Sequence, residues 1–413
     1  MTMPLEGIKV LDWTVGQQGP VATSMLGDLG ADVIKIEQPI RGDPLRGMQT
    51  AMGRAMTGLP EGRNYYFENN NRSKRSITVD ITRKEGQEII YQLVKTADVF
   101  VNNFRRRVAL KYNLDYETLS QYNPKLVYAH ASAFGLEGPD SEKPGVDYVI
   151  QARSGFMTSV GEPGMAPQIL LGGVCDQIGA LVLGYAMVIA LLTRERQAIG
   201  QEVDVSLLGS SIIAQGVNVA ARTILGTEFP KYERAKPGNP LWNHYQCADG
   251  KWLALAMLES DRCWPDLCKV IGIEQLQNDP KFHSIDSRRA NSEKLVSILD
   301  GIFIGKPRDE WITTFDRALS AGADIVYSRL NSISDLPDDP QVTANDYITT
   351  FDHPEYGKIQ VVGMPYKFSK TPGVVGGIGL RAAPELGQHT EEVLVEAGYS
   401  HSEVAKFKDS KII

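Results

Sequence analysis

The chain has 413 residues, long enough for roughly two or three domains with a core that needs no disulfides. It carries 43 Lys and Arg against 50 Asp and Glu, a formal net charge of −7 without a basic block, so we expect no nucleic-acid or membrane partner. Its 4 cysteines form no Cys-x-x-Cys pair and its 6 histidines are scattered, which predicts reduced thiols and no metal site. The first residues lack a signal-peptide pattern, so we expect a cytoplasmic protein.

The first 135 residues alternate short apolar runs with amphipathic stretches. The predicted elements, in chain order, are a strand at 7–13, a helix at 20–29, a strand at 32–37, a helix at 85–95, and strands at 98–101 and 126–130. Pro20 suits a first helical position, where its missing N–H costs little. Alternating strands and helices predict an α/β fold, a Rossmann-like large domain with a mostly parallel sheet and helices on both faces.

The most apolar stretch, residues 178–192, is too short for a membrane span and is followed at once by Arg194, so it predicts a buried core helix. Residues 226–246 mix proline and glycine with charged and aromatic residues, which predicts a linker or lid. The remaining predicted elements are a helix at 205–225, a strand at 251–257, helices at 262–271 and 292–304, strands at 359–363 and 364–369, and a helix at 391–398.

We therefore divide the chain into three parts. Residues 1–225 form the N-terminal part of the large domain, residues 226–325 a smaller α+β domain, and residues 326–413 a return segment that completes the large domain.

Asp176 is the residue that points most directly to chemistry. It follows small residues and precedes the apolar helix, and at a helix N-terminus unpaired N–H groups and the dipole favour an anion. Asp is also a common N-cap, and this stretch taken alone favours a cap over a reactive carboxylate.

The turn after the first strand superficially suggests a dinucleotide-binding fingerprint. It has two glycines, Gly16 and Gly19, where three are needed, and Pro20 removes a donor that a pyrophosphate would use. NAD binding is therefore not predicted. Gln17 lies in this turn at the carboxyl end of a strand, where an amide can donate to a ligand, although a solvated loop residue is the alternative.

Short motifs across most of the chain resemble one known family in their order and spacing. They are Pro4–Asp12, Gly30–Glu37, Gly42–Arg46, Lys74–Asp80, Ala97–Phe104, Asn123–Ala129 and Gly387–Thr390. The chain resembles the class III CoA-transferases, the family of formyl-CoA transferase and carnitine CoA-transferase.

The resemblance implies that Asp176 is a nucleophile and that coenzyme A moves from an acyl-CoA donor to a free carboxylic acid. A carboxylate suits this role because its mixed anhydride keeps the energy of the thioester. The CoA thiolate then gives an aspartyl-CoA thioester, which the acceptor attacks. A helix N-terminus would keep Asp176 ionised. Acyl-CoA and CoA are substrates, and no permanently bound cofactor is implied.

The resemblance also implies roles for other side chains. Gln17 matches an amide that positions or stabilises an oxyanion near the thioester. The residues implied to contact CoA are Asn103, Phe104, Lys111, Arg75, Arg41 and Val79. For Arg75 and Arg41, ion pairs at the surface are an equal alternative. Tyr66 and Asp147 match pocket positions, and the arginines at 105–107 either contact phosphates or form a solvated face.

One region departs from the family. Formyl-CoA transferase has a mobile glycine-rich loop where this chain has residues 236–242, which are stiffer and more aromatic and predict a larger acid than oxalate or formate. Trp242, His244 and Tyr245 either line an acceptor pocket or form the core of the small domain. We expect a donor such as succinyl-CoA and an aromatic or branched acceptor; intramolecular transfer within one dicarboxylic acid is the alternative.

Three other functions have less support in the sequence than transfer. α-Methylacyl-CoA racemases share this fold and pair the Asp with a His in a Gly-His-Asp triplet, but here Val146 takes the place of the His and cannot move a proton. His130 is expected as a core or pocket residue. A non-catalytic subunit would lack Asp176, and no feature favours a CoA-binding scaffold. The resemblance further implies a homodimer of two interlocked rings.

Overall fold

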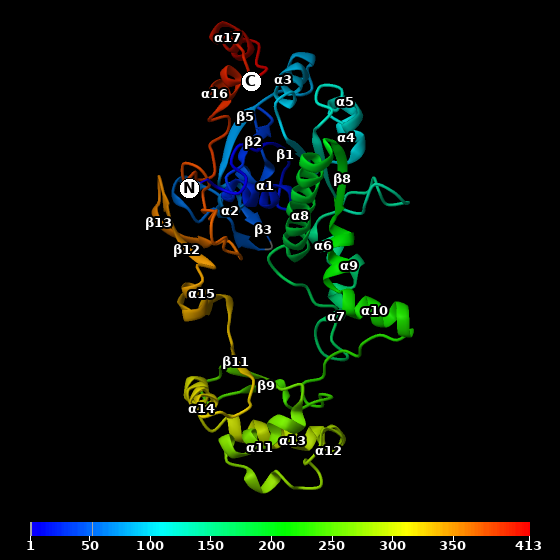
Figure 1. The fold of residues 1–413 in the computed structure, drawn as a ribbon, viewed down its shortest axis with the longest axis vertical. Coiled ribbons are helices and arrows are strands. Elements are labelled where there is room, and N and C mark those ends of the chain that lie inside the picture. The colour runs from blue at the N-terminus through cyan, green and yellow to red at the C-terminus, as the bar shows by residue number, and fades with distance from the viewer. Residues whose placement is uncertain (1, 52) are drawn as a thin grey trace. The chain divides into compact units, whose positions relative to one another are not determined.

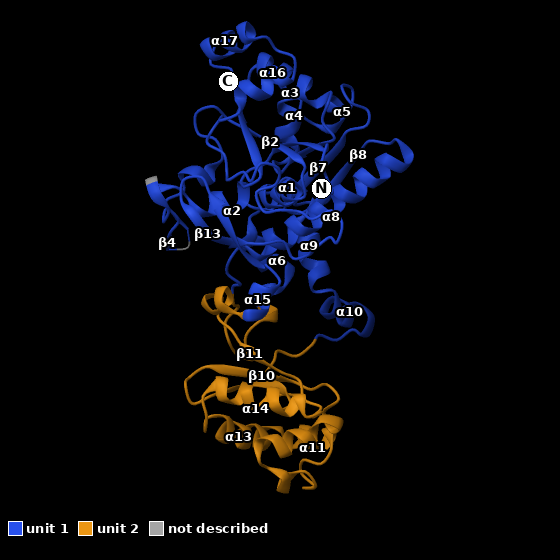
Figure 2. Ribbon diagram, turned by 60° about the vertical axis from the view of Figure 1, so that its left-hand side comes forward, with its two compact units in different colours: residues 1–157, 169–228, 340–413 blue, residues 158–168, 229–339 orange. Residues whose placement is uncertain are grey.

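The computed structural model describes residues 2–51 and 53–413, which form two compact units. Unit 1 comprises residues 1–157, 169–228 and 340–413, and unit 2 comprises residues 158–168 and 229–339 (Figure 2). Unit 1 is therefore built from both ends of the chain, and unit 2 is inserted between them.

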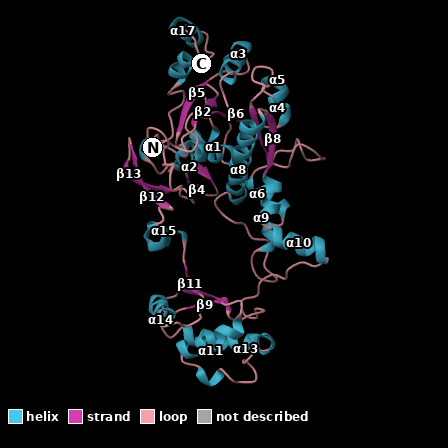
Figure 3. Ribbon diagram, viewed as in Figure 1, coloured by secondary structure: helices cyan, strands magenta, loops and turns pink. Residues whose placement is uncertain are grey.

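Within the described residues, unit 1 contains a six-stranded parallel sheet in the order β5-β2-β1-β6-β7-β8 (Figures 1 and 3). Its strands are β1 (Lys9–Trp13), β2 (Asp32–Glu37), β5 (Lys74–Thr78), β6 (Val99–Asn102), β7 (Val127–Ser132) and β8 (Gln201–Ser206). Strands β1, β2, β5, β6 and β7 are buried along almost their whole length, as expected for a parallel sheet covered by helices. The predicted α/β fold with a mostly parallel sheet is confirmed.

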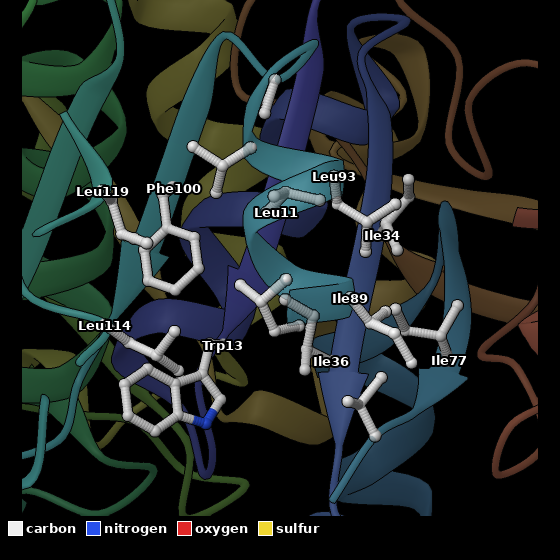
Figure 4. Packing of buried hydrophobic residues seen from close by; sticks show 14 of the residues in the cluster. Leu11, Trp13, Ile34, Ile36, Ile77, Ile89, Leu93, Phe100, Leu114 and Leu119 are labelled. Carbon is white, nitrogen blue, oxygen red and sulfur yellow. The ribbon is translucent and has the colours of Figure 1, made fainter. Parts of the chain in front are cut away.

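Side chains that alternate along the strands form a separate core on each face of the sheet. On one face, Leu11, Ile34 and Phe100 pack against Ile89 and Leu93 of α3 (Lys84–Val94) (Figure 4). This core also receives residues of α4 (Arg106–Lys111), α5 (Tyr116–Leu119), α16 (Thr390–Glu396) and α17 (His401–Asp409), or of the turns beside them. The C-terminal segment thus helps to cover the first strands of the chain.

The other face is covered by α1 (Gln18–Asp28) and α8 (Val174–Gln197). Among the described residues, α8 is the one helix long and apolar enough to cross a membrane by length and composition alone. Its Ala180, Leu183 and Met187 are fully buried with Leu26 of α1 and Val101 of the sheet, so α8 serves as a core helix here.

Several details of the predicted elements are wrong. Residues 242–246, within the predicted linker or lid, form a strand, and the sheet strand at 74–78 was not predicted. Residues 201–206 form the edge strand β8, and the helix expected over 205–225 splits into α9 (Leu207–Ala214) and α10 (Gly216–Leu225). Residues 364–369 form no strand, because the backbone leaves β13 (Gly357–Val362) and meets Pro365, which has no N–H to give to a ladder.

The remaining elements of unit 1 lie around the sheet. They are η1 (Pro44–Gly47), β3 (Thr50–Ala51), β4 (Arg54–Ala55), η2 (Pro60–Gly62), α2 (Tyr65–Asn71), α6 (Asp147–Ser154), α15 (Pro340–Ala344) and β12 (Ile348–His353), which pairs with β13; α7 (Phe156–Ser159) continues into unit 2.

Unit 2 has an antiparallel sheet in the order β11-β10-β9, with helices packed on it. Its elements are β9 (Trp242–Gln246), β10 (Trp252–Ala256), α11 (Ser260–Ile271), η3 (Glu274–Leu276), α12 (Ile285–Ala290), α13 (Ser292–Phe303), α14 (Arg308–Ser320), β11 (Tyr327–Leu330) and η4 (Ile333–Asp338). Tyr245, Trp264 and Phe303 are in its core. The domain boundaries at 225 and 325 stay a prediction; because β11 pairs with β10, unit 2 extends to Asp339.

Candidate active site

A cavity of about 380 Å³ in unit 1 contains several of the predicted site residues. Gln17, Asn103, Phe104, Arg105, His130 and Asp176 are among the residues that line it. They come from the turns after β1 and β6, from β7 itself and from the start of α8. Strands β1, β6 and β7 are neighbours in the sheet, so the cavity lies at their carboxyl edge, where parallel α/β sheets bind ligands.

A larger cavity, of about 530 Å³, is lined by Asn345, Asp346, residues of β12 and residues between 363 and 380. None of the predicted site residues lines it. Size alone therefore does not identify the functional site, and the convergence of polar groups favours the cavity beside Asp176.

Asp176 is the third residue of α8 and does not cap it. The N-cap position belongs to Gly173, which has a left-handed backbone with φ 68° and offers no side chain. The carboxylate of Asp147, at the start of α6, takes the cap instead: its Oδ1 accepts from the N–H of Cys175 at 2.7 Å and of Asp176 at 3.4 Å. The N-cap interpretation of Asp176 is therefore wrong, and its carboxyl group borders the cavity.

Burial raises the pKa of Asp176 to about 7, and the negative charge of Asp147 adds to this effect. The expectation that the helix N-terminus keeps Asp176 fully ionised is thus corrected, because Asp147 already occupies the first N–H groups of α8. A carboxyl group with a pKa near neutrality is poised between acid and base, and such groups are concentrated at functional sites.

Gln17 joins the turn after β1 to the start of α8. Its side chain is buried, and its Nε2 donates to the carbonyl oxygens of Gly172 at 3.3 Å and Gly173 at 3.4 Å. Its Oε1 accepts a hydrogen bond from the Tyr66 hydroxyl. Burial, and after it the negative charge of Asp176, raises the pKa of Tyr66, so this phenol keeps its proton. Gln17 is thus not a solvated loop residue.

Asn103 and Phe104 form the wall of the cavity beyond β6. The Asn103 Oδ1 accepts from the N–H of Val15 at 2.9 Å, and its Nδ2 donates to the Val15 carbonyl at 2.7 Å. The Phe104 ring packs against Trp13 with centroids 4.6 Å apart. Both interactions tie the β6 turn to the β1 turn, and both ends of the Asn103 amide are engaged in this contact.

The remaining predicted contacts do not line this cavity. The guanidinium of Arg75 contacts the carboxylates of Asp32, Glu392 and Glu396, as its ion-pair alternative proposed. Arg41 and Lys111 are exposed elsewhere, with Lys111 over the ring of Tyr112. Val79 is buried in the core beside α3.

Two basic side chains do line the cavity, Arg105 and Lys143. Lys143 lies 2.5 Å from Asp140, and nothing in its sequence surroundings marks it as a site residue. Arg106 and Arg107 instead contact carboxylates, Arg106 those of Glu117 and Glu202 and Arg107 that of Glu142. The run of three arginines therefore divides between the cavity and the surface.

The aromatic residues of β9 belong to unit 2. Tyr245 is fully buried in the core of that unit, Trp242 is half exposed, and the His244 ring lies between those of Tyr232 and Trp252. The segment at 236–242 is tied to unit 2 by hydrogen bonds, such as that from Ser292 to the carbonyl of Pro237 at 2.6 Å. Tyr245 is thus a core residue.

Comparison with known proteins gives one consistent family. The model of the family described as CoA-transferase family III matches residues 5–390. The (R)-2-hydroxy-4-methylpentanoate CoA-transferase of Clostridioides difficile is 34% identical over 414 residues, covering 100% of both chains. The succinate–glutarate CoA-transferase of Agrobacterium fabrum is 33% identical, covering 95% of each chain. A crystal structure of a CAIB/BAIF family protein from Brucella suis matches with a TM-score of 0.82 at 29% identity, covering 96% of this chain and 100% of that one.

The contact between Gly173 and Gln17 predicts that alanine is tolerated less well at Gly173 than at the neighbouring Gly172. A Cβ on Gly173 would lie 2.2 Å from the Gln17 Oε1, whereas a Cβ on Gly172, also at positive φ, meets nothing within 4 Å. Both Gly→Ala changes cost roughly 1–2 kcal/mol for a left-handed backbone. Gly173→Ala should lose roughly 1–3 kcal/mol more, because it overpacks against the amide. Urea unfolding measures the difference, and equal losses would contradict the contact.

Proposed function

The chain belongs to CoA-transferase family III, and from this premise we propose that it moves coenzyme A from an acyl-CoA to a free carboxylic acid by covalent catalysis on Asp176. The observation that carries the proposal is the position of Asp176. Its carboxyl group borders a cavity at the carboxyl edge of a parallel sheet, at the start of a helix and beside the buried amide of Gln17.

The first half of the reaction consumes the donor. The ionised carboxylate of Asp176 attacks the thioester carbon, the C–S bond breaks, and the CoA thiolate leaves a mixed anhydride. The thiolate attacks the Asp176 carbonyl of this anhydride, releasing the donor acid and forming an aspartyl-CoA thioester. A carboxylate nucleophile makes this possible, because the anhydride is at least as activated as the thioester that it replaces.

The second half repeats these steps in reverse order with the acceptor. The acceptor carboxylate attacks the aspartyl carbonyl and expels the thiolate, which then attacks the acceptor carbonyl of the new anhydride. The product acyl-CoA leaves and Asp176 is again a carboxylate. Each step exchanges one acyl bond for another, so the reaction needs no oxidant, metal or water.

Gln17 is placed to stabilise the oxyanions. The Tyr66 hydroxyl binds its Oε1, so Nε2 is the end of the amide that faces the start of α8. The hydrogen bonds from Nε2 to Gly172 and Gly173, at 3.3 and 3.4 Å, are long, and a charged oxygen is a stronger acceptor than either carbonyl. We expect Nε2 to turn to the substrate oxygen as its charge develops.

Coenzyme A would lie along the cavity wall formed by Asn103 and Phe104. Arg105 and Lys143 supply positive charge there for its phosphates. Arg41 and Lys111 stay predictions for phosphate contacts outside the cavity. We do not extend the role to Arg75, whose three carboxylate partners already neutralise it, or to Val79 in the core.

For the acids, we propose a donor such as succinyl-CoA and a branched or aromatic acceptor. The relatives named for 2-hydroxy-4-methylpentanoate and for succinate and glutarate support a branched acceptor and a dicarboxylic donor. Intramolecular transfer within one dicarboxylic acid is the alternative. Racemisation has less support, because Val146 lines the cavity in place of a base, and both ring nitrogens of His130 already face protein oxygens.

We further propose a cytoplasmic homodimer of two interlocked chains. Large apolar side chains are exposed along the outer side of α8 and on α9 and α10, among them Leu181, Tyr185, Leu192, Ile213 and Val217. A contiguous apolar surface on a soluble protein usually marks a protein interface.

The nucleophile is tested by trapping. Incubation with a panel of acyl-CoAs and then hydroxylamine should convert activated Asp176 into a hydroxamate, which peptide mass spectrometry locates; the acyl-CoA that produces it identifies the donor. Asp176→Asn should give no hydroxamate while the protein stays folded, because an amide does not attack a thioester. Absence of any adduct together with deuterium exchange at an acyl-CoA α-carbon would reject transfer in favour of isomerisation.

The raised pKa of Asp176 predicts the pH dependence of the first step. Only the carboxylate reacts, so the single-turnover rate at saturating acyl-CoA should fall as pH drops through about 7. Asp147→Asn keeps an oxygen to cap α8 but removes a negative charge, so the acid limb should move to lower pH. Asp140→Asn serves as the control, because the charge that it removes does not shift the pKa of Asp176. If the acid limb of the rate profile stayed in place in Asp147→Asn, the effect of Asp147 on the pKa of Asp176 would be contradicted.

The dimer is tested by placing a charge on the exposed apolar face of α8. Tyr185→Glu puts a charge on an exposed position of that face, whereas Tyr122→Glu makes the same change on an exposed tyrosine in the turn after α5. Analytical ultracentrifugation should show a dimer for the wild type and Tyr122→Glu and a lower molar mass or loss of soluble protein for Tyr185→Glu. A wild-type monomer would reject the interlocked arrangement.

A further inference from the structure

Beside the candidate active site, the buried ring of His130 lies against the partly buried carboxylate of Asp204, and the reaction above uses neither residue. They lie directly opposite each other on the neighbouring parallel strands β7 and β8. His130 is 4% exposed and lines the cavity together with Asp176 and Phe104. Withdrawing an ionisable pair from water costs stability. The contacts of the two His130 ring nitrogens therefore show what the pair does at the site.

One nitrogen of His130 has only one possible role. Its Nε2 lies 2.8 Å from the carbonyl oxygen of Phe104. A carbonyl oxygen can only accept, so Nε2 must carry the hydrogen. The ring therefore holds the backbone of the turn after β6, the same turn in which Asn103 bonds to Val15 on both sides of its amide.

The other nitrogen then faces an acceptor. Nδ1 lies 3.4 Å from the Oδ1 of Asp204, a buried atom that has no hydrogen-bond donor among the described residues. In a neutral ring with its hydrogen on Nε2, Nδ1 presents a lone pair, and two acceptors would face each other. A second proton between Nδ1 and Oδ1 removes this repulsion and supplies the missing donor.

The surrounding charges are consistent with such a proton. Burial raises the pKa of Asp204, which favours its retention, while the charge of His130 acts in the opposite direction, as expected for two groups that compete for one proton. Glu202, on the same strand, and Arg106, on α4, also act on this pair; they lie 3.9 Å apart, so their opposite charges largely offset each other. Asp176, Arg105 and Lys143 border the same cavity.

We propose that His130 and Asp204 are positioning residues that share one proton and thereby fix the Asn103–Arg105 turn as the wall against which coenzyme A binds. The inference rests on the proposed binding of CoA in this cavity. With the proton in place, the ring is held at both nitrogens and the turn is fixed. When the proton is lost as pH rises, Nδ1 and Oδ1 repel each other and the turn loosens.

The consequence is a specific kinetic signature. The KM for acyl-CoA should be low while the pair holds its proton and should rise as the pair loses that proton with increasing pH, whereas kcat depends on Asp176 and does not fall with it. His130→Leu removes the hydrogen bond to Phe104, so its KM should rise roughly five- to tenfold at neutral pH with a smaller change in kcat. His130→Gln keeps an N–H donor for this carbonyl and should restore a low KM.

The shared proton is tested by comparing two neighbouring carboxylates. Asp204→Asn offers a permanent N–H to Nδ1, so its KM should no longer rise with pH. Glu202→Gln removes a charge from the same strand without touching the ring, and it should keep the rise. A wild-type KM that does not change with pH, or an Asp204→Asn profile that matches the wild type, would overturn the proposal.

A second measurement separates this inference from the proposed nucleophile. Ring-nitrogen NMR of the free protein, with the His130→Gln spectrum identifying the signals, should show Nε2 protonated throughout and the Nδ1 signal changing between wild type and Asp204→Asn. An unprotonated Nε2 at neutral pH would overturn the arrangement whatever Asp176 does. Failure of the hydroxylamine trap with the expected ring signals would instead reject Asp176 and leave the pair established.

Discussion

The first turn of α8 is the constraint on which the site depends. A helix begins with N–H groups that need acceptors, and here the carboxylate of Asp147 supplies them from α6. Gly173 is left-handed at this point, so the amide of Gln17 can lie directly against the backbone. These contacts turn Asp176 away from capping and toward the cavity. Burial and the charge of Asp147, the group that caps the helix, thus raise the pKa of the Asp176 carboxyl group.

Beneath the Gln17 turn lies a layer of buried charge. Lys35 donates to the carbonyl of Thr14 at 2.8 Å and to Asp43 at 3.0 Å, and Asp43 in turn accepts from the N–H of Gly16 at 3.4 Å. Lys74 bonds Asp12 in the same layer. Buried ion pairs add little net stability because desolvation offsets attraction, but removing one partner is severe. Their effect is to hold the turn after β1 in one conformation, and this fixes the position of the Gln17 amide.

The four central strands could be predicted from the sequence because they are short, largely apolar runs between helices. The two outer strands could not, because polar residues hide the pairing: β5 begins with Lys74, Arg75 and Ser76, and β8 carries Gln201, Glu202 and Asp204. At the site, small residues before an apolar helix draw attention to Asp176, but this stretch alone favours a cap, and only the motifs across the whole chain imply a nucleophile. Lys143 carries no local pattern, and its relevance emerges only when the chain folds. The predicted contact of Arg75 with CoA fails for the same reason: its partners Glu392 and Glu396 lie more than 300 residues away in the sequence, and only folding brings them to it.

The return segment has a consequence for how the protein is made. The core on one face of the sheet includes Val393, Leu394, Val404 and Ile412, and the carbonyl of Ile412 accepts from the N–H of Asp80 at 2.7 Å. A ribosome releases these residues only after the whole of unit 2. The first strands therefore remain uncovered on one face, and prone to aggregation, while the inserted unit is synthesised. The strands that border the candidate site are made early, but the core that supports them is completed by residues that follow unit 2.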